Sequence, residues 1–591
     1  MTDRKPITRK VINSPETCVD DNLRGLVVLF PKLQLHPKHR VVTVRTKGDS
    51  GRVAVLGGGG SGHEPFAAGL TGPGMLDGAV AGGIFASPPT GHVLYAITQL
   101  YKHHSGTLTF NGSGGVLVII GNYTGDRLNF GKAIEKAKIA GIKVEGIIVG
   151  EDVASSKNKT GGRGMCGEVI LYKLSAAMSL RGYDLLTLRD MTLEASNYMA
   201  TLGVCLSACS LPGQPPLFEI AQDEMELGAG VHGEAGIEKL KIGTAKEIVA
   251  QILDRVVAHL KLESGTRVIA AINNLGSTSI LEVNIISGEI KEYLESKGIK
   301  LERIYAGHLK ASLEMHGFQI CLLHLNKQYG DLWLEFLDDS TDCAGWAGTN
   351  LSVPSKEGDD NEDDDTLLQS QGRKPSSGPK LSMKEQEILR DSLSIAAEDL
   401  VKNEEVLNRL DSGCGDGDCG ITLKNFGQAI KSYLKTASLE NPSSVLWDLS
   451  EIAEKDMGGT SGGIYSLGLS AASLSIASAS FNTREAWISA WESAMNAITK
   501  YGGAEPGDRT MLDTLHSAAV VFRENLSSDF KTALRKTADA AEAGCKATAN
   551  MTARAGRASY VSHEYVHEED AGARAVAVWL QAIIALIVQH Y

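Results

Sequence analysis

A polar stretch at residues 351–380 divides this chain into two parts that need separate hydrophobic cores. Residues 357–365 hold seven acidic side chains in nine positions, and residues 371–380 are mostly glycine, proline, serine and basic residues. Such a segment cannot bury enough apolar surface to offset the entropy lost on ordering it. The length of 591 residues also exceeds what one core usually serves. We therefore predict a flexible acidic linker at 351–380 between two folded regions, residues 1–350 and 381–591.

The two regions differ in their hydrophobic pattern. Before the linker, short β-branched runs recur at residues 52–56, 115–120, 144–149, 267–272 and 319–323. Because these runs are mostly apolar throughout, they indicate strands buried on both faces, as in α/β layers. After the linker, Leu389, Leu393 and Leu400 follow the spacing of one helical face near 383–410, and Ala- and Leu-rich stretches such as 467–477 and 531–549 continue the pattern. The predicted fold class is α/β before the linker and all-α after it.

The charge and the cysteines exclude several classes of function. The net charge is −13, about half of it from the acidic run, and no basic patch with interleaved aromatics suggests nucleic-acid binding. The N-terminus has no apolar signal segment, and the longest apolar run, residues 575–588, is interrupted by Gln581 and is too short to span a bilayer. Nine scattered cysteines without a C-x-x-C pair suit a reducing compartment. We expect a cytoplasmic protein that acts on neither nucleic acid nor membranes.

A glycine-rich segment, residues 57–65 (GGGGSGHEP), follows the first predicted strand. It satisfies the dinucleotide fingerprint G-x-G-x-x-G, and Asp77 lies near the position of a ribose-binding acid, so a dinucleotide site is one interpretation. A run of glycines also matches this pattern by chance. Pro65 suits the first turn of a helix, which would leave His63 exposed at a strand-to-helix turn as a candidate acid or base. A site for another small ligand and a purely structural turn remain alternatives.

Two other polar segments of the α/β region are candidates for a site. The predicted strand 115–120 leads into residues 121–127 (GNYTGDR), where Asp126 either lines the carboxyl edge of the sheet or is an ordinary surface residue. In residues 226–236 (ELGAGVHGEAG), glycines bracket His232 so closely that a ligand could approach its ring.

Three carboxylates lie close together in the helical region. Asp411, Asp416 and Asp418 are separated by glycines, and their mutual repulsion is costly unless a cation neutralises it. Oxygen ligands suit Mg²⁺ that bridges nucleotide phosphates. An EF-hand is excluded, because its twelfth position must be glutamate and counting from Asp416 reaches Gly427; a solvated acidic turn remains the alternative. Residues 457–463 (MGGTSGG) could hold phosphates, and no Walker sequence occurs in the chain.

Together these segments resemble the dihydroxyacetone kinase family over nearly the whole chain. The matching stretches before the linker are residues 59–65, 122–130, 226–234 and 313–318. The resemblance implies an N-terminal dihydroxyacetone-binding region of two α/β subdomains and a C-terminal helical barrel that binds the nucleotide. In that family, the histidine at the position of His232 adds to the substrate carbonyl and forms a hemiaminal.

The resemblance also assigns the remaining residues of both sites. His63 and Asp126 match the acid/base pair that deprotonates the substrate hydroxyl. The substrate-binding residues matched are Gly60, Ser61, Gly62, His63 and Asp126. The Mg²⁺ ligands matched are Asp411, Asp416 and Asp418. The positions matched around ATP are Asp416, Gly417, Asp418, Cys419, Thr460, Ser461, Gly502, Asp508, Arg509, Arg557, Asp570 and Gly572.

The chain departs from the family pattern at three places. Many members carry lysine where this chain has Gly121, so a lysine contact to the substrate is absent or replaced by backbone and water. Residues 307–312 (GHLKAS) differ from the Met-Thr-Ser pattern of the family. Ala571 replaces the proline of Asp-Pro-Gly in the adenine-side lid, which implies a looser lid.

The resemblance implies an ATP- and Mg²⁺-dependent dihydroxyacetone kinase (glycerone kinase) that also accepts glyceraldehyde and forms a homodimer. Both regions lie on one chain, as in the ATP-consuming members rather than in those that use phosphoenolpyruvate. Two rivals are a lyase that releases cyclic FMN from FAD at the same metal site and a non-catalytic protein that only binds the sugar. The intact histidines and metal aspartates argue against the second rival.

Overall fold

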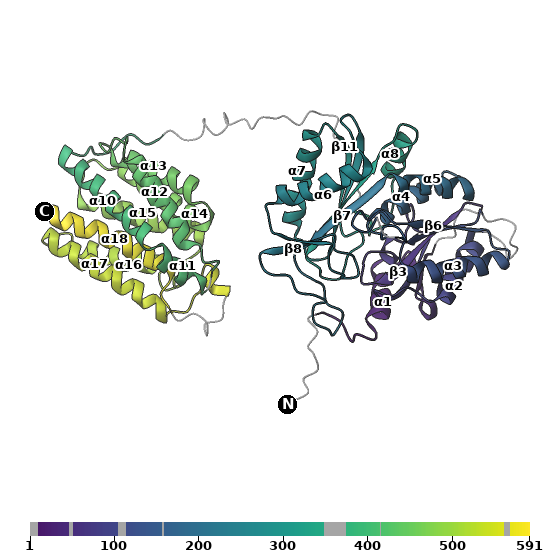
Figure 1. The fold of residues 1–591 in the computed structure, drawn as a ribbon. Coiled ribbons are helices and arrows are strands. Elements are labelled where there is room, and N and C mark those ends of the chain that lie inside the picture. Colours follow the sequence, from purple (N-terminus) through teal and green to yellow (C-terminus); the bar gives the residue numbers. More distant parts are fainter. Residues whose placement is uncertain are drawn as a thin grey trace. The chain divides into compact units, whose positions relative to one another are not determined.

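The computed structural model describes residues 10–45, 51–104, 114–156, 159–347, 374–413, 415–560 and 568–591. The chain forms two compact units, Met1–Asp360 and Asn361–Tyr591 (Figure 1). We call them the N-terminal and C-terminal units and describe each by itself. The acidic run at 357–365 and most of the predicted linker lie outside the described residues.

The first sheet of the N-terminal unit has the strand order β1-β2-β4-β3-β5-β6. Its strands are β1 (Leu33–His36), β2 (Val41–Val44), β3 (Ala54–Ser61), β4 (Gly78–Ile84), β5 (Val116–Gly121) and β6 (Val144–Val149). The last four pair in parallel, and the β1–β2 hairpin adds antiparallel to β4. The order reverses at β3, whose neighbours β4 and β5 both follow it in the sequence. In open α/β sheets such a reversal opens a crevice at the carboxyl ends of the strands.

Helices cover both faces of this sheet, because side chains on a strand point alternately to its two sides. The helices are α1 (Cys18–Leu29), α2 (Thr90–His104), α3 (Thr124–Ile139), α4 (Gly167–Leu180), α5 (Leu185–Asn197) and α8 (Gly330–Asp338). Along β5, Val118 and Ile120 pack in one cluster with α2 and α3, whereas Leu117 and Ile119 pack in another with α4. The continuous apolar run of this strand is therefore explained by burial on both faces.

The second sheet has the strand order β11-β10-β12-β7-β8-β9. Its strands are β7 (Met199–Cys205), β8 (Glu224–Leu227), β9 (Glu238–Lys241), β10 (Arg267–Asn274), β11 (Lys300–Gly307) and β12 (Gly317–His324). Only β10 and β11 pair in parallel; the other pairs are antiparallel. Helices α6 (Ala245–Leu260) and α7 (Ile280–Ser296) contribute to the apolar cluster on one face. The unit thus contains two α/β subdomains, as expected.

Helix α4 belongs to the core of both subdomains. All of its residues from Gly167 to Ser179 are buried. Its apolar side chains share one cluster with Leu117 of the first sheet and Ile269 of the second, and with Leu23 of α1 and Trp333 of α8. This common core holds the carboxyl ends of strands from both sheets in a fixed relation.

The C-terminal unit is all-helical in the part that the structure describes. Its α-helices are α10 (Met383–Lys402), α11 (Glu404–Ser412), α12 (Cys419–Tyr433), α13 (Pro442–Ile452), α14 (Gly459–Ala477), α15 (Arg484–Gly502), α16 (Met511–Glu524), α17 (Phe530–Ala547) and α18 (Ala571–His590). Helix α10 contacts α12, contacts continue in chain order from α12 to α18, and α18 closes the ring against α10. This closed ring is the barrel that the sequence led us to expect.

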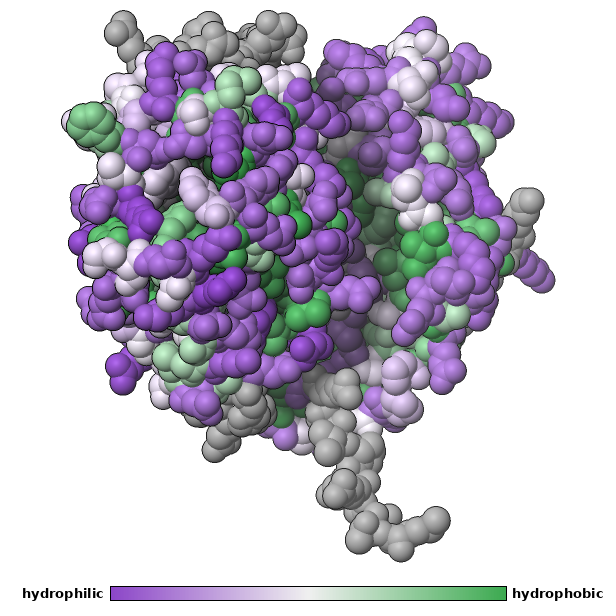
Figure 2. All heavy atoms as spheres, turned by 90° about the vertical axis from the view of Figure 1, so that its left-hand side faces the viewer, coloured by the Kyte–Doolittle hydropathy of each residue, from purple (hydrophilic) through white to green (hydrophobic). Residues whose placement is uncertain are grey.

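The helices of the ring turn apolar side chains inward. A cavity of about 900 Å³ is lined by side chains from α10 and from α12 to α18, among them Leu393, Leu446, Trp491 and Ile584. The face that the molecule turns toward the viewer in Figure 2 is mainly hydrophilic, with hydrophobic side chains showing between the polar ones. Amphipathic helices in a closed ring produce this distribution.

Helix α18 corrects one expectation. Its 20 residues are long and apolar enough to cross a membrane by length and composition, although the run 575–588 was expected to be too short. About half of the helix, 44% of its most apolar window, is buried inside the unit. It packs against α10, α16 and α17, so its apolar character is explained by its place in the core.

The expected strands are confirmed, but three local expectations are wrong. β3 continues through the glycines to Ser61, and no α-helix begins at Pro65; a short 3-10 helix follows at Ala68–Leu70. The helix expected near 383–410 is broken at Asn403 into α10 and α11. The packed part of the C-terminal unit begins inside the predicted linker, because the backbone oxygens of Pro375, Ser376 and Ser377 accept hydrogen bonds from the start of α13.

Candidate active site

The glycines of β3 are required because large side chains occupy the space on both sides of the strand. A Cβ atom at Gly57 would lie 2.7 Å from the Tyr172 ring, and one at Gly60 would lie 2.8 Å from the Ala86 nitrogen. Gly62, with φ +95°, turns the chain out of the strand and presents His63. Ser61 is buried and donates its hydroxyl hydrogen bond to the Gly82 carbonyl, so this side chain is engaged within the fold.

His63 has a defined protonation state. Its Nδ1 lies 2.8 Å from the backbone oxygen of Ala311, and because a carbonyl can only accept, Nδ1 must carry the proton. Nε2 is therefore the lone-pair nitrogen, and it is buried without a hydrogen-bond partner among the described residues. The ring is 1% exposed, so the expectation of a surface histidine is wrong. Burial and, secondarily, the neighbouring His232 and Lys310 hold the pKa of His63 well below its usual range.

Asp126 lies in the first turn of α3, directly after β5. The side chain is 7% exposed, and its Oδ1 is buried with no hydrogen-bond partner among the residues described. Burial raises the pKa of this carboxyl to about 6, against the opposing effect of a hydrogen bond from Ser87 and the charge of Lys310. A carboxylate with this pKa can accept a proton near neutral pH.

His232 lies in the loop after β8, and a network of ion pairs holds this loop. Its backbone N–H donates to Glu234, which accepts in turn from Arg163 at 3.0 Å. Arg163 also donates to the buried Asp152 at 2.7 Å and to the Gly228 carbonyl at 2.8 Å. Asp152 and Arg163 follow the first sheet, whereas Gly228 and Glu234 follow β8 of the second. The network therefore fixes the histidine of one subdomain to the other.

Four rings meet at the carboxyl ends of the two sheets. The centroids of His63 and His232 are 4.8 Å apart at an interplanar angle of 83°, Phe85 stacks on His63 at 4.9 Å, and Tyr123 contacts the edge of His232 at 4.4 Å. Burial lowers the pKa of His232 to about 4, an effect that Glu234 opposes and that Lys310 and Arg163 strengthen. Both imidazoles are therefore neutral at pH 7.

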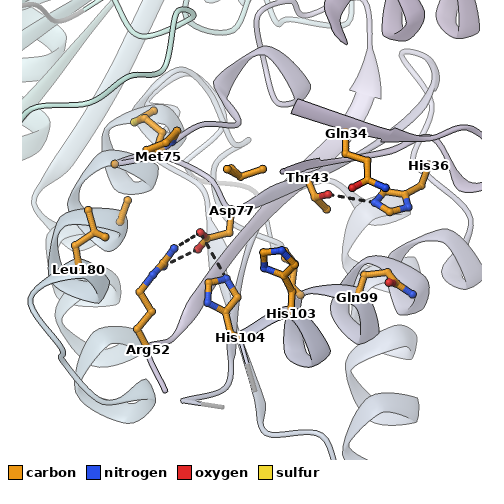
Figure 3. Close-up of a pocket in the computed structure, with 15 residues that line it drawn as sticks. Gln34, His36, Thr43, Arg52, Met75, Asp77, Gln99, His103, His104 and Leu180 are labelled. Atoms are coloured by element: carbon orange, nitrogen blue, oxygen red, sulfur yellow. Dashed lines mark hydrogen bonds and ion pairs between the residues drawn. The ribbon is translucent and has the colours of Figure 1, made fainter. Parts of the chain in front are cut away.

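The dinucleotide interpretation of the glycine segment fails. Asp77 does not face the glycines as a free acid: it accepts from the Val55 N–H at 2.9 Å and from Arg52, and it lies 3.7 Å from His104. Figure 3 shows that Arg52 and His104 both point toward Asp77. These three residues line a pocket of about 200 Å³. The glycines themselves pair within the sheet instead of forming a turn before a helix.

The lysine that the sequence lacks at position 121 has a counterpart elsewhere in the chain. Lys310, in the loop after β11, donates to Glu168 at 2.8 Å and to the Gly164 carbonyl at 3.1 Å, and its ammonium lies 4.2 Å from the Phe66 ring centroid. A Cβ atom at Gly121 would lie 3.4 Å from this ammonium. A lysine is therefore present beside Gly121, although it comes from a different segment of the chain. Lys310 lies in the segment 307–312 that departs from the family pattern, but its contacts could not be predicted, because Glu168 is 142 positions away in the chain.

The three aspartates of the C-terminal unit come together as expected. Asp411 at the end of α11, Asp416 in the following loop and Asp418 at the start of α12 each place a carboxylate oxygen within 4.8 Å of the others. Asp411 also accepts the N–H groups of Gly417 at 2.9 Å and Asp418 at 3.1 Å. Asp416 pairs with Arg557, whose charge lowers the pKa of Asp416. Burial and then the charge of Asp416 raise the pKa of Asp418.

This group fits Mg²⁺ by its donor set. Three carboxylates at such distances repel one another unless a cation lies among them, and Mg²⁺ prefers oxygen ligands. Gly417 has φ +76°, so the tight loop that brings Asp416 and Asp418 together depends on a glycine at that position. Cys419 begins α12 and is half-buried, and burial raises the pKa of its thiol to about 12.

Arg509 and Asp570 form a second polar pair close to the aspartates. Arg509 is 2% exposed with φ +65°, donates to the Glu568 carbonyl, and lies 3.9 Å from Asp570; its Nε and Nη1 have no hydrogen-bond partner among the residues described. Asp570 caps α18 by accepting from Ala573, and burial raises the pKa of Asp570 to about 6. Ala571 occupies the first position of this helix, and the Asp570 cap is present without a proline there.

The other matched positions lie at helix ends. Thr460 and Ser461 are in the first turn of α14, which begins after Gly458, a residue with φ +65°. Gly502 is the last residue of α15, and Asp508 accepts a hydrogen bond from the Glu505 N–H. Gly572 is the second residue of α18. In the described part of the chain no hydrogen bond links Thr460, Ser461 or Gly502 to the aspartates.

Comparison with known proteins finds relatives for both units of the chain. Residues 24–342 match the Dak1 domain and residues 413–585 match the DAK2 domain. The triokinase/FMN cyclase of Mus musculus is 39% identical over 98% of this chain and 99% of its own length. Dihydroxyacetone kinase 1 of Saccharomyces cerevisiae is 32% identical over 96% of this chain and 97% of its own.

A solved structure extends the match to the fold. The crystal structure of the dihydroxyacetone kinase from C. freundii in complex with AMP-PNP and Mg²⁺ superposes with a TM-score of 0.66 and 29% identity, covering 99% of this chain and 100% of that one. Both domains and the order in which they occur are thus shared with these relatives. The chain belongs to the dihydroxyacetone kinase family.

Proposed function

We propose that this chain is an ATP-dependent kinase that converts dihydroxyacetone to dihydroxyacetone phosphate and holds the substrate as a hemiaminal on His232. One observation carries the proposal: two neutral histidine rings touch in a buried site, where Nε2 of His63 and Oδ1 of Asp126 lack partners among the described residues. Buried polar atoms rarely stay unpaired in a folded protein. The hydroxyl groups of a small ketone would donate hydrogen bonds to these two atoms.

His232 supplies the group that binds the carbonyl. Its neutral imidazole has a lone pair that adds to the carbonyl carbon, forming a C–N bond while the C=O π electrons move to oxygen. That oxygen takes up a proton, and the ring gives up the proton of its other nitrogen, so the hemiaminal is neutral. The lowered pKa of His232, about 4, keeps the lone pair available at pH 7.

His63 and Asp126 supply the base. The lone pair on Nε2 of His63 can take the proton of the terminal hydroxyl, with the Nδ1 proton held by Ala311. Asp126, whose pKa is about 6, is ionised at pH 7 and can accept a hydrogen bond from the same hydroxyl. The substrate oxygen is thereby prepared to accept a phosphoryl group.

The C-terminal unit would hold Mg-ATP. Asp411, Asp416 and Asp418 are the ligands proposed for Mg²⁺, which neutralises the phosphate charge when it is bound with ATP. Arg557 and Arg509 offer cations near these aspartates, and the first turn of α14 offers backbone N–H groups for phosphate. On the family resemblance, Cys419, Asp508 and Asp570 would also lie beside the nucleotide.

The substrate range can be measured directly. We expect ATP turnover with dihydroxyacetone and with glyceraldehyde, which have a carbonyl, and none with glycerol, which lacks one. The adduct can be followed by ¹³C NMR with [2-¹³C]dihydroxyacetone, whose carbonyl resonance should be replaced by that of a tetrahedral carbon. His232→Ala should abolish the adduct, whereas His324→Ala, a half-buried histidine at the end of β12, should leave it unchanged. An adduct that persists without His232 contradicts the proposal.

A second activity is supported by the relatives. Release of cyclic FMN from FAD is proposed because the Mus musculus relative, 39% identical, is named a triokinase/FMN cyclase. This reaction would use the aspartates of the C-terminal unit but not His232. Assay of FAD breakdown with Mn²⁺ tests it: Asp418→Asn should lower both activities at limiting metal concentration, and His232→Ala should remove only the kinase.

Assembly and location are further parts of the proposal. We propose a homodimer in the cytoplasm, on the family resemblance. Light scattering of the purified full chain would show a mass near twice 62.9 kDa. A monomer that is fully active would contradict the dimer.

A further inference from the structure

A buried lysine lies in the histidine site, on the segment that fixes His63. Lys310 is 3% exposed, although lysine is seldom fully buried. Its backbone is fixed by Asn273, whose side chain accepts from the Lys310 N–H at 3.0 Å and donates to the Lys310 carbonyl at 2.7 Å. The next residue, Ala311, accepts the Nδ1 proton of His63 and donates its own N–H to the His63 carbonyl. The positions of Lys310 and His63 are therefore linked through one peptide unit.

The ammonium of Lys310 has a fixed position between the two subdomains. Glu168 of α4 and the Gly164 carbonyl accept its hydrogen bonds, and the Phe66 and Tyr123 rings lie 4.2 and 5.5 Å away. Tyr123 is also the ring that contacts the edge of His232 at 4.4 Å. The positive charge therefore lies one ring away from the histidine proposed to bind the ketone.

Gly121 leaves the space that this ammonium needs. A Cβ atom at Gly121 would lie 3.0 Å from Glu168 Oε2 and 3.4 Å from Lys310 Nζ, so a larger residue would displace the pair. A buried ion pair is weak evidence for stability, because the cost of desolvating both charges offsets their attraction. The pair is better explained by what its charge does to the groups around it.

We propose that Lys310 is a positioning residue of the ketone site: its fixed ammonium excludes a second positive charge from the histidine pair and keeps His232 in the form that adds to a carbonyl. The inference rests on the proposed function and names a residue that acts through His232 rather than on the substrate. The charge acts in the same sense on all three groups, since it disfavours protonated His63 and His232 and favours ionised Asp126. Two other charged groups act on His232: Glu234 raises its pKa, and Arg163 lowers it together with Lys310.

The test measures adduct formation as a function of pH in the full-length protein. The variants are Lys310→Met and the charge-compensated double variant Lys310→Met/Glu168→Gln. With [2-¹³C]dihydroxyacetone and no ATP, the wild-type adduct should persist down to about pH 4 and be lost below it. The acid midpoint should rise by about one pH unit in Lys310→Met, because a nearby charge shifts a pKa by this order. It should rise by less in the double variant, which also loses the opposing carboxylate. A merely structural ion pair predicts that the double variant regains the wild-type profile.

Two further variants give matched controls. Lys173→Met removes another buried lysine, also on α4, whose ammonium donates to the Phe336 carbonyl; it should leave the acid midpoint unchanged. Gly121→Lys combined with Lys310→Met returns an ammonium to the same region from β5 and should bring the midpoint back toward the wild-type value. Thermal melting reports whether each variant is folded.

The outcomes separate this inference from the proposed function. If the wild-type protein forms no adduct at any pH, the covalent step itself is wrong. If it forms the adduct and the double variant has the same acid midpoint, or Lys173→Met shifts it equally, the role of Lys310 is wrong. A wild-type midpoint at or above about 6.5, the value of an ordinary histidine, contradicts the inference even if no variant folds.

Discussion

The carboxylate of the proposed base is held in a state that is costly for folding. Asp126 is 7% exposed, and its pKa of about 6 means that the ionised form is disfavoured in the folded protein. A raised folded-state pKa adds stability as the pH falls, because the folded protein binds the proton more tightly than the unfolded chain does. At pH 7.5 the ionised Asp126 therefore opposes folding, and below about pH 4 this opposition is gone.

Replacement of Asp126 by asparagine should expose this cost. Asp126→Asn should remove kinase activity and stabilise the protein at pH 7.5 by roughly 2–3 kcal/mol, from a pKa shift of about two units. The gain should shrink as the pH falls from 6 towards 4. Calorimetry at pH 7.5 and 4.5 measures it, with the exposed Asp190→Asn as control. A variant that is less stable than the wild type at pH 7.5 would contradict this account of the site.

The sequence identified some site residues and missed others for one physical reason. His63, Asp126 and His232 each stand beside glycines at the end of a strand, so their local sequence carries a signal. Lys310 meets Glu168 across 142 positions. Arg163 reaches Glu234 across 71. Such partners depend on how two sheets come together around α4, which the local pattern does not encode.

At the scale of elements, β3 is a strand built largely from residues that do not favour strands. Its glycines pair with β4 in parallel register, Gly57 opposite Ala79 and Gly59 opposite Ala81. The propensity of glycine predicted a turn here, but tertiary packing decided the outcome: the Tyr172 and Phe66 rings occupy the space where side chains would lie. The hydrophobic runs of the other strands did predict their elements, because burial on both faces leaves a continuous apolar pattern.

Two glycine-to-alanine changes should separate packing from flexibility. Gly57→Ala brings a methyl group to 2.7 Å from Tyr172 and should destabilise the N-terminal unit by about 2 kcal/mol or more. Gly131→Ala, in the middle of α3 with no atom within 4 Å of the new methyl group, should stabilise it by about 0.5–1 kcal/mol. Urea unfolding of both variants compares them. If both variants changed the free energy of unfolding equally, β3 would not need its glycines for space.

The aspartates of the acidic loop between α11 and α12 differ in their contacts and exposure. Asp411 accepts backbone N–H groups of the loop, whereas Asp418 is exposed. Asp418→Asn should therefore raise the Mg²⁺ concentration needed for half-maximal kinase activity by about tenfold or more without changing the melting temperature. Asp411→Asn should raise the Mg²⁺ requirement and also lower the melting temperature. Kinase assays over a Mg²⁺ series, with thermal melts, measure this, and near wild-type turnover of Asp418→Asn at limiting Mg²⁺ would place the metal elsewhere.

The whole molecule consists of two units whose cores are separate among the residues described. Two pieces, residues 1–347 and 374–591, should each fold and melt as the corresponding transitions of the full chain do. Mixed together, they should restore kinase activity with a concentration dependence that the intact chain lacks, because the covalent connection raises the effective concentration of one unit near the other. Calorimetry and a dilution series of the mixture test this. A piece that stays unfolded alone would show that the units share stability.

Helix α8 and the residues after it are synthesised late but belong to the core around the first sheet. Trp333, Phe336 and Trp346 complete the cluster that contains Leu23 and Leu117, more than two hundred positions earlier. A ribosome adding roughly 5–20 residues per second needs on the order of 20 to 70 s to reach this part of the chain. From residue 149, where the last strand of the first sheet ends, until that point, the sheet has been synthesised but lacks part of its cover. The nascent chain thus exposes apolar surface while about two hundred further residues are added, and this is the stage at which chaperones have the most to bind.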